Sequence, residues 1–535
     1  MSTHPAKTSR FFNKVSHRLP SILATGGFLI VSGCQTYTAQ TAGRDSALRS
    51  GSIERAVMLA DLDAEKHKTG NDAVLYRLEQ GSILRQAALA GISAPDAGAA
   101  PAEAGSAAAV QQTATNIAEK QAAGSTPPAS NTIYLRRSLD AFNAADERVS
   151  EFEEQAKVKL GSSTVAMFTT QANTPYVGRA YDRVMMNAYK ALDYMQLGDF
   201  DAARVELNRA LQRQRDAVAE NARRIEEATE EARRAREGAT ENNQSYDVEK
   251  ARSDSTSGPA FAEVEAELDA RIKPYGDYVN PFVVFLDGLF FITKGESGSD
   301  LERARKSFER VAGMVPENSY ARADWKMAEA AANGRLPSGV TYVIFEAGSA
   351  PYRESKRIDL PVFPLTGKVS YVGAAFPKLH FQDGSVGSLS VVAGGSAHAT
   401  AVVCSMDSVV ARDFKNEWPA IITKTILTTA AKAAVDGVVQ KQAKDKWGIT
   451  GQLLAKAATV AWGTTSNIAD TRTWRSLPRE FQYLRVATPA DRRLTISAGS
   501  ETRTVDILPG GVNVVYVKMN DTNSPVLVSQ FALTN

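Results

Sequence analysis

Histidines and cysteines are rare in this 535-residue sequence, and its many carboxylates include no pair that stands out from the solvated helix faces. The histidines after the first 33 residues are His67, His380 and His398, and none has a neighbour at the short spacing typical of zinc ligands. Ser396 lies two residues before His398, but it lacks the G-x-S-x-G turn that exposes a nucleophilic serine. We therefore expect no enzymatic activity, no catalytic residue, no metal site and no cofactor.

The two cysteines, Cys34 and Cys404, differ in their surroundings. Cys404 lies in the apolar stretch TAVVCSM and is expected to be an inert core residue. Cys34 follows the apolar run from Leu19 to Val31, which is shorter than the about 20 residues that span a bilayer. Together with the basic residues before it, this run is typical of a secretory signal peptide at residues 1–33.

The segment Val31-Ser32-Gly33-Cys34 resembles the lipobox of bacterial lipoproteins. The resemblance implies cleavage before Cys34 and acylation of its thiol, and several acyl chains together anchor a protein stably. Gln35 follows the cysteine, whereas an aspartate there favours retention in the inner membrane of enterobacteria. We therefore expect a lipid-anchored protein on the periplasmic face of the outer membrane.

The charge of the chain argues against nucleic acid as a partner. The full sequence has a formal net charge of +2, and its first 33 residues contain four basic residues and no acidic one. Removing those four cations leaves a net charge of −2, whereas a nucleic-acid-binding protein needs a clustered basic face. The partners expected are other envelope proteins, and the oligomeric state is left open.

Composition and hydrophobic periodicity predict an α+β multidomain chain. The predicted parts are a signal peptide (1–33), a lipidated tether (34–50), a helical repeat domain (51–333) with disordered insertions at 91–131 and 237–258, and a β-rich, sandwich-like domain (340–535) with a helical insertion at 408–463. That insertion is amphipathic and alanine-rich, so it would either cover the sheet or lie on a membrane surface.

Two stretches, 181–211 and 280–316, each predict a pair of amphipathic helices. In the second stretch, Ala304, Phe308, Val311 and Pro316 have the spacing of the second half of a tetratricopeptide repeat. Residues 138–145 repeat part of this spacing and would complete a unit that begins near residue 71. Three such units would suffice for a shared core, and a generic helical hairpin is the alternative.

The first helix of such a unit normally lines a concave groove. The residues placed there are almost all apolar and form a candidate partner groove: Met185, Leu192, Met195, Phe282, Phe285, Leu289 and Ile292. Because large exposed apolar patches are rare, either a partner helix or strand occupies this groove or another part of the chain fills it.

The stretches NIADTRTWRSLPREFQYLRV (467–486), YDRVMMNAYKALDYMQLGDFDAARVE and FKNEWPAIITKTI resemble an uncharacterised family of Gram-negative outer-membrane lipoproteins. The resemblance covers most of residues 178–520 and implies a tetratricopeptide-like helical N-terminal half and a β-rich C-terminal half. It implies no catalytic residue and no cofactor. It also suggests a link to peptidoglycan synthesis, because relatives are encoded near activator lipoproteins of peptidoglycan synthases.

These observations favour a membrane-anchored lipoprotein that acts as a periplasmic scaffold or adaptor for protein–protein interaction in cell-envelope assembly. Fold and location alone do not establish such a role. A periplasmic carrier of an apolar ligand, bound on the apolar groove, and a periplasmic hydrolase with an unrecognised site are the alternatives.

Overall fold

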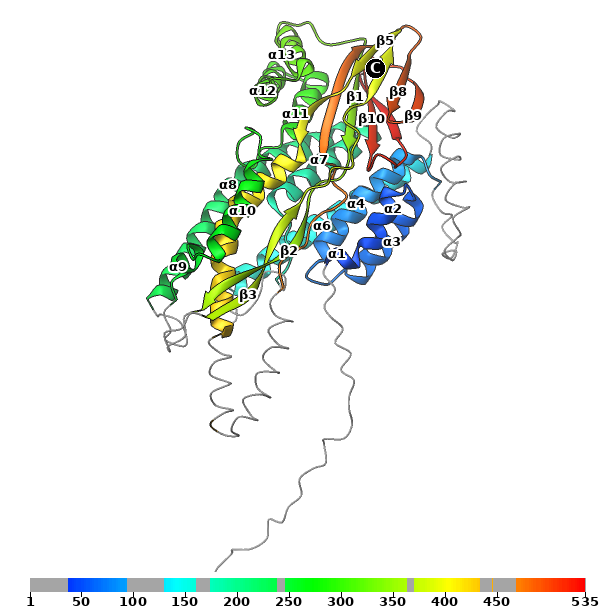
Figure 1. Cartoon of the computed structure of the whole chain (residues 1–535). Helices are drawn as coiled ribbons and strands as arrows, with labels where there is room; N and C mark the ends of the chain where they lie inside the picture. The colour runs from blue at the N-terminus through cyan, green and yellow to red at the C-terminus, as the bar shows by residue number, and fades with distance from the viewer. Residues whose placement is uncertain are drawn as a thin grey trace, which may run out of the picture. The chain divides into compact units, whose positions relative to one another are not determined.

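The computed structural model describes residues 37–93, 129–159, 174–237, 246–362, 370–433, 445 and 468–534 (Figure 1). The predicted signal peptide, Cys34, and the larger part of the predicted insertions at 91–131 and 408–463 lie outside these residues. Up to residue 332 the described elements are helices, and from residue 340 they are mainly strands. The prediction of an α+β chain with a β-rich C-terminal region is confirmed.

Most helices of the first half pack against the helix that precedes or follows them in the chain (Figure 1). In chain order they are α1 (Tyr37–Gln40), α2 (Ala42–Arg49), α3 (Ile53–Lys66), α4 (Ala73–Ala90), α6 (Ala129–Lys159), α7 (Ala180–Leu197), α8 (Phe200–Arg236), α9 (Val248–Arg252), α10 (Ser257–Asp269), α11 (Pro281–Lys294), α12 (Gly298–Met314) and α13 (Ser319–Ala332).

Two segments expected to be irregular are helical. Within the predicted tether, α1 and α2 form because Tyr37 and Leu48 are buried in the core, and the Tyr37 hydroxyl donates to Glu79 over 3.3 Å. Within the predicted loop at 237–258, α9 forms because its Val248 and Ala251 are buried. In both segments a few apolar side chains reach the core, although the composition of the whole segment is polar.

Among the described helices, the pairs α4–α6, α7–α8 and α11–α12 form antiparallel hairpins. In two of them a glycine on one helix lets a phenylalanine ring on the other approach closely. A Cβ added at Gly81 would lie 2.6 Å from the Phe142 ring, and one at Gly288 would lie 3.2 Å from the Phe308 ring. The hairpin α4–α6 therefore has the same kind of contact as α11–α12, although residues 91–128 separate its helices in sequence.

The strands of the second half form three sheets within the described residues. They are β1 (Val340–Ala347), β2 (Tyr352–Val362), β3 (Ser370–His380), β4 (Ser390–Ala393), β5 (Ser396–Ala399), β6 (Ala401–Ser405), β7 (Glu480–Ala487), β8 (Arg493–Ala498), β9 (Glu501–Asp506), β10 (Val512–Met519) and β11 (Leu527–Thr534). The first sheet has the order β11-β10-β1-β7-β6, with β1 parallel to β10 and antiparallel to β7. The second has the order β5-β4-β8-β9, and β2 and β3 form a hairpin.

Both faces of the β11-β10-β1-β7-β6 sheet are buried by different neighbours. On β1, Tyr342 and Ile344 belong to the same apolar cluster as the helices. Val343 and Phe345 point the other way and belong to a second cluster with side chains of β4, β8 and β9, such as Leu494. Because both faces of β1 are buried, its sequence is a nearly continuous run of apolar residues rather than an alternation of apolar and polar ones.

The predicted helical insertion begins with a helix at residue 406 that is described to residue 433. Its Trp418 ring lies 5.4 Å from the Phe414 ring and 6.0 Å from that of Phe376 on β3. The Phe261 ring of α10 lies 6.1 Å from Trp418 on another side. The described part of the insertion thus belongs to the core, between α10 and the β2–β3 hairpin.

We predict that Gly81→Ala lowers the free energy of unfolding by about 1–3 kcal/mol, because the added methyl group overlaps the Phe142 ring. The matched control is Gly313→Ala on α12, where an added Cβ meets no heavy atom within 4 Å. There alanine should be neutral or stabilise the helix by about 0.5–1 kcal/mol. Urea denaturation of both variants measures the difference, and equal stability of the two would contradict the close helix approach.

Candidate functional site

The seven residues of the candidate partner groove are buried side chains on the inner faces of α7 and α11. Each is at most 2% exposed: Met185, Leu192, Met195, Phe282, Phe285, Leu289 and Ile292. All seven belong to the apolar cluster that also contains side chains of β1, β7 and β10.

Aromatic rings of the sheet cover this face of the helices. The Phe282 ring stacks on Phe481 of β7 with centroids 3.8 Å apart and an interplanar angle of 6°. The Phe285 ring lies 4.3 Å from that of Tyr483, two residues further along the same strand. In the structure the chain itself therefore fills the groove, and these residues form the core between the helices and the sheet.

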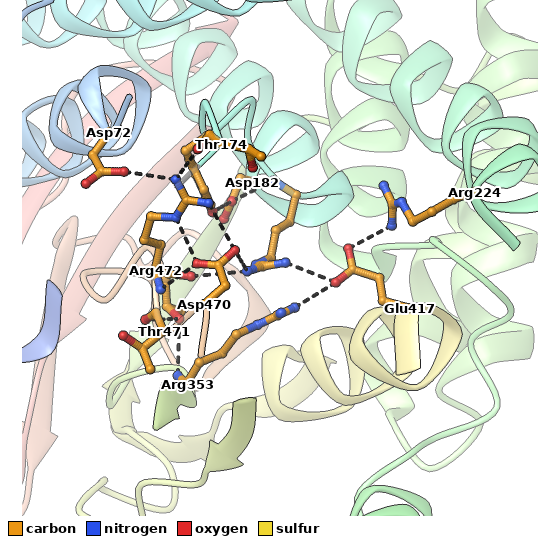
Figure 2. A network of polar contacts seen from close by, with 12 residues as sticks. Asp72, Thr174, Asp182, Arg224, Arg353, Glu417, Asp470, Thr471 and Arg472 are labelled. Atoms are coloured by element: carbon orange, nitrogen blue, oxygen red, sulfur yellow. Dashed lines mark hydrogen bonds and ion pairs between the residues drawn. The ribbon is translucent and has the colours of Figure 1, made fainter. Parts of the chain in front are cut away.

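A cluster of charged side chains lies at one end of this same junction (Figure 2). The Glu417 carboxylate, on the helix that begins at residue 406, accepts from three arginines that come from three other elements. Its oxygens lie 3.0 Å from Nη1 of Arg179, 2.9 Å from Nη2 of Arg353 and 3.0 Å from Nη1 of Arg224. Arg179 directly precedes α7, Arg353 lies on β2 and Arg224 lies on α8.

A second carboxylate, Asp470, extends this cluster toward the N-terminal helices (Figure 2). Asp470 lies 3.3 Å from Nη2 of Arg179 and 2.8 Å from Nε of Arg472. The Arg472 guanidinium in turn donates to Asp72, which directly precedes α4, over 3.0 Å and to the Thr174 carbonyl over 2.7 Å. The segment that leads into β7 is thus fixed to three places in the helical half.

The charges of this cluster shift the pKa values of its acids in opposite directions. Burial alone would raise the pKa of Glu417, but Arg179, Arg353 and Arg224 outweigh it and hold the pKa below its ordinary value. Burial and the neighbouring Glu417 charge raise the pKa of Asp413, one turn earlier on the same helix. Neither carboxyl oxygen of Asp413 has a hydrogen-bond partner among the described residues, which is consistent with a neutral acid there.

A second buried cluster joins the centre of the helical half to the sheet. Nζ of Lys518 on β10 lies 2.5 Å from Glu346 on β1, and the Tyr189 hydroxyl of α7 donates to the same carboxylate over 3.2 Å. Arg85 of α4 pairs with Asp193 of α7, and its guanidinium lies 4.7 Å from the Tyr189 ring centroid. These charged groups are all buried and compensate one another, so we interpret the cluster as structural.

The residues considered for catalysis are dispersed in the structure. His67 follows α3 and stacks on Tyr76, and His380 ends β3, 3.7 Å from Glu354. Ser396 and His398 both lie on β5, and no hydrogen bond joins their side chains among the described contacts.

Three findings bear on other kinds of site. Burial raises the pKa of the Cys404 thiol to about 12, so this cysteine is a poor nucleophile. Across the described ranges, no group of three or more His, Cys, Asp or Glu residues is placed to hold a metal ion. In the same part of the chain, no helix combines the length and the apolar character needed to cross a bilayer.

The ionic clusters were not predicted from the sequence. Arg179 and Glu417 are 238 positions apart, and neither lies in a recognisable motif. The one feature of the sequence near this region was the stretch at 467–486, which is part of the family resemblance and contains Asp470, Arg472 and Trp474. The Trp474 indole donates to Ser82 of α4 over 3.1 Å, so this segment in fact contacts the helical half.

We predict that Phe285→Asp prevents folding, because it places an unpaired carboxylate among aromatic rings of the core. The control Val205→Asp changes a 46%-exposed residue on α8 and should leave the protein folded. Circular dichroism and size-exclusion chromatography of both variants test this. A folded, monodisperse Phe285→Asp protein would mean that the inner face is open to solvent rather than core.

We also predict that Asp413→Asn becomes more stable relative to wild type as the pH rises. The folded protein keeps Asp413 protonated where the unfolded chain, with a pKa of about 4, has released the proton, so wild-type stability falls with rising pH across that interval. The difference between the variants can change by up to about 1.4 kcal/mol per pH unit.

For Glu417→Gln we predict the opposite pH dependence: the variant should become more stable relative to wild type as the pH falls. Because the pKa of Glu417 is lowered by folding, its ionised form stabilises the protein at neutral pH, and that stabilisation is lost as the pH falls below about 4. Urea denaturation from about pH 5 to about pH 9 tests Asp413, and acid titration tests Glu417. A pH-independent difference between wild type and Asp413→Asn would contradict the neutral state of this acid.

Comparisons with protein-family models, with curated proteins and with solved structures find no match to the chain. Within the described residues, the apolar inner face of α7 and α11 and the buried charges lie inside the folded body.

Proposed function

We propose that the chain is a lipoprotein of the outer membrane whose folded body is a periplasmic scaffold for protein–protein interaction in cell-envelope assembly. The observation that carries the proposal is the segment Val31-Ser32-Gly33-Cys34 behind a basic and then apolar leader. Acylation of Cys34 would supply the anchor, and Gln35 favours the outer membrane. The family resemblance makes peptidoglycan synthesis the first process in which to look for partners.

The short connection between the proposed anchor and the folded body supports a role at the membrane. Gln35 and Thr36 alone separate Cys34 from Tyr37, the first residue of α1. Because one extended residue spans at most about 3.6 Å, this connection reaches no more than about 11 Å. Such an anchor would hold the body near the membrane, where it would position a partner rather than reach across the periplasm.

We assign the helical hairpins to a tetratricopeptide-like repeat and the two larger sheets to a sandwich. The close contacts of Gly81 with Phe142 and of Gly288 with Phe308 support the first assignment, since small residues facing an aromatic ring are typical of these repeats. The apolar cluster shared by the β11-β10-β1-β7-β6 and β5-β4-β8-β9 sheets supports the second.

Two observations bear on the carrier and hydrolase alternatives. A carrier would use the apolar inner face of α7 and α11, but Phe481 and Tyr483 of β7 occupy that face. A hydrolase would need an accessible nucleophile and base, whereas the acids Glu417 and Asp470 are buried against arginines. Among the described residues, these contacts give no support to either alternative.

We predict that the full-length protein incorporates an alkyne-labelled fatty acid in Gram-negative cells and fractionates with the outer membrane. Cys34→Ala should lose the label and the membrane association, whereas Cys404→Ala should keep both because that thiol is buried. Crosslinking in intact cells, followed by mass spectrometry, should recover envelope proteins with the anchored form that the Cys34→Ala form does not recover. An unlabelled wild-type protein, or identical crosslinked sets, would refute the proposal.

A further inference from the structure

The outer surface of the helical half contains a cleft between α8 and α12, with α11 as its floor. It consists of two adjoining hollows of about 490 and 440 Å³ that share Leu211 and Arg303 in their walls. The walls are joined by contacts across the cleft: Nη1 of Arg303 donates to Oδ1 of Asn208 over 2.7 Å, and Arg204 lies 3.3 Å from Asp300. The hollow therefore lies between helices that are fixed relative to each other.

Cations dominate the lining of this cleft. Five basic residues line it, against the two carboxylates of Asp287 and Glu302: Arg209, Arg215, Arg303, Lys306 and Arg310. On α12 the spacing of three of them is i, i+3 and i+7, which places them in one row along the cleft. This local excess of positive charge contrasts with the net charge of −2 expected for the chain without its first 33 residues.

Two of these arginines have no ion pair with another described residue. The Arg215 guanidinium donates to the neutral side-chain oxygen of Gln212, over 2.6 and 3.2 Å, and has no ion pair among the described residues. Arg310 is exposed and likewise has no partner within the described part of the chain. Arg303, in contrast, is held in place by the buried Asp287, 2.5 Å from its Nη2.

Apolar side chains accompany the cations on α8. Leu211 lines both hollows, and Val218 follows it by seven residues on the same face of the helix with Arg215 between them. Val218 is 53% exposed and lies about one helical turn beyond Arg215, the last α8 residue that lines the hollows. A ligand complementary to this surface would be an extended chain in which carboxylates, which pair with the cations, alternate with apolar groups, which contact Leu211 and Val218.

We propose that the α8–α12 cleft binds an acidic segment of a partner protein, with its carboxylates on Arg215 and Arg310 and an apolar side chain on Leu211 and Val218. Guanidinium groups bind carboxylates through paired charge-assisted hydrogen bonds, which suits this occupant. A single-stranded nucleic acid would need aromatic rings for base stacking, and none lines the hollows. A flat bilayer surface would contact fewer of the cations in this concave cleft than an extended peptide that enters it.

This inference rests on the proposed scaffold role and names the chemistry of the partner. Its test uses the full-length lipoprotein in detergent and a fluorescent synthetic peptide of alternating Glu and Leu residues. The variant is the double charge reversal Arg215→Glu and Arg310→Glu, which breaks no ion pair among the described residues. The control reverses Arg223 and Arg236 further along α8, whose side chains are each 75% exposed. Their surface ion pairs with Glu227 and Asp247 contribute little to stability, so their loss should leave the fold intact.

We predict that the wild-type protein and the Arg223/Arg236 control bind the Glu–Leu peptide equally in fluorescence anisotropy. The Arg215/Arg310 variant should bind it at least about tenfold more weakly, and added salt should weaken wild-type binding because the charges are exposed. A Lys–Leu peptide of equal length should not bind the cleft. Equal affinity of wild type and the cleft variant, or equal binding of both peptides, would overturn the proposal.

Two further measurements separate this proposal from others. Phosphatidylglycerol vesicles that bind in a cleft-dependent way, while the peptide does not, would replace the protein partner with a lipid surface and overturn the proposal. In intact cells, a Cys34-dependent crosslinked set that is unchanged by Arg215→Glu and Arg310→Glu would overturn the cleft and leave the scaffold role. No Cys34-dependent crosslinks at all would instead refute the scaffold role, whatever the peptide result.

Discussion

The contact between the aromatic side chains of β7 and the inner faces of α7 and α11 is the constraint on which the rest of the structure depends. Phe282 and Phe285 lie on Phe481 and Tyr483, so separating the helices from the sheet would expose a large apolar surface to water. The helical half and the β-rich region are therefore parts of one folded body, and the inner faces of α7 and α11 are not free for a partner.

The buried charges add specificity to this apolar contact. Removing Arg179, Glu417 and Asp470 from water carries a large desolvation cost, which their mutual attraction offsets only in the correct geometry. Because these groups come from the start of α7, the helix at residue 406 and the segment before β7, only one arrangement of the two halves pairs them all. We infer that these ion pairs determine how the two halves are oriented more than they increase the stability of the folded protein.

The sequence allowed the local elements to be predicted better than their assembly. The helical hairpins followed from amphipathic spacing and from residues such as Gly288 and Phe308, whose partners are close in the chain. The strand β2 is hard to predict from periodicity because it contains several charged residues and Pro361, and its buried apolar residues Ile358 and Leu360 are few. The pairing of Arg179 with Glu417 could not be predicted, since nothing local indicates which distant charge a buried arginine meets.

The most direct test of a single body is hydrogen exchange measured by mass spectrometry under native conditions. We predict that the amides of α7 and α11 exchange with the same opening free energy as those of β1 and β10, because the helices cannot separate from the sheet without global unfolding. Faster exchange of α7 and α11 while the sheet stays protected would contradict it, since the inner face would then open on its own.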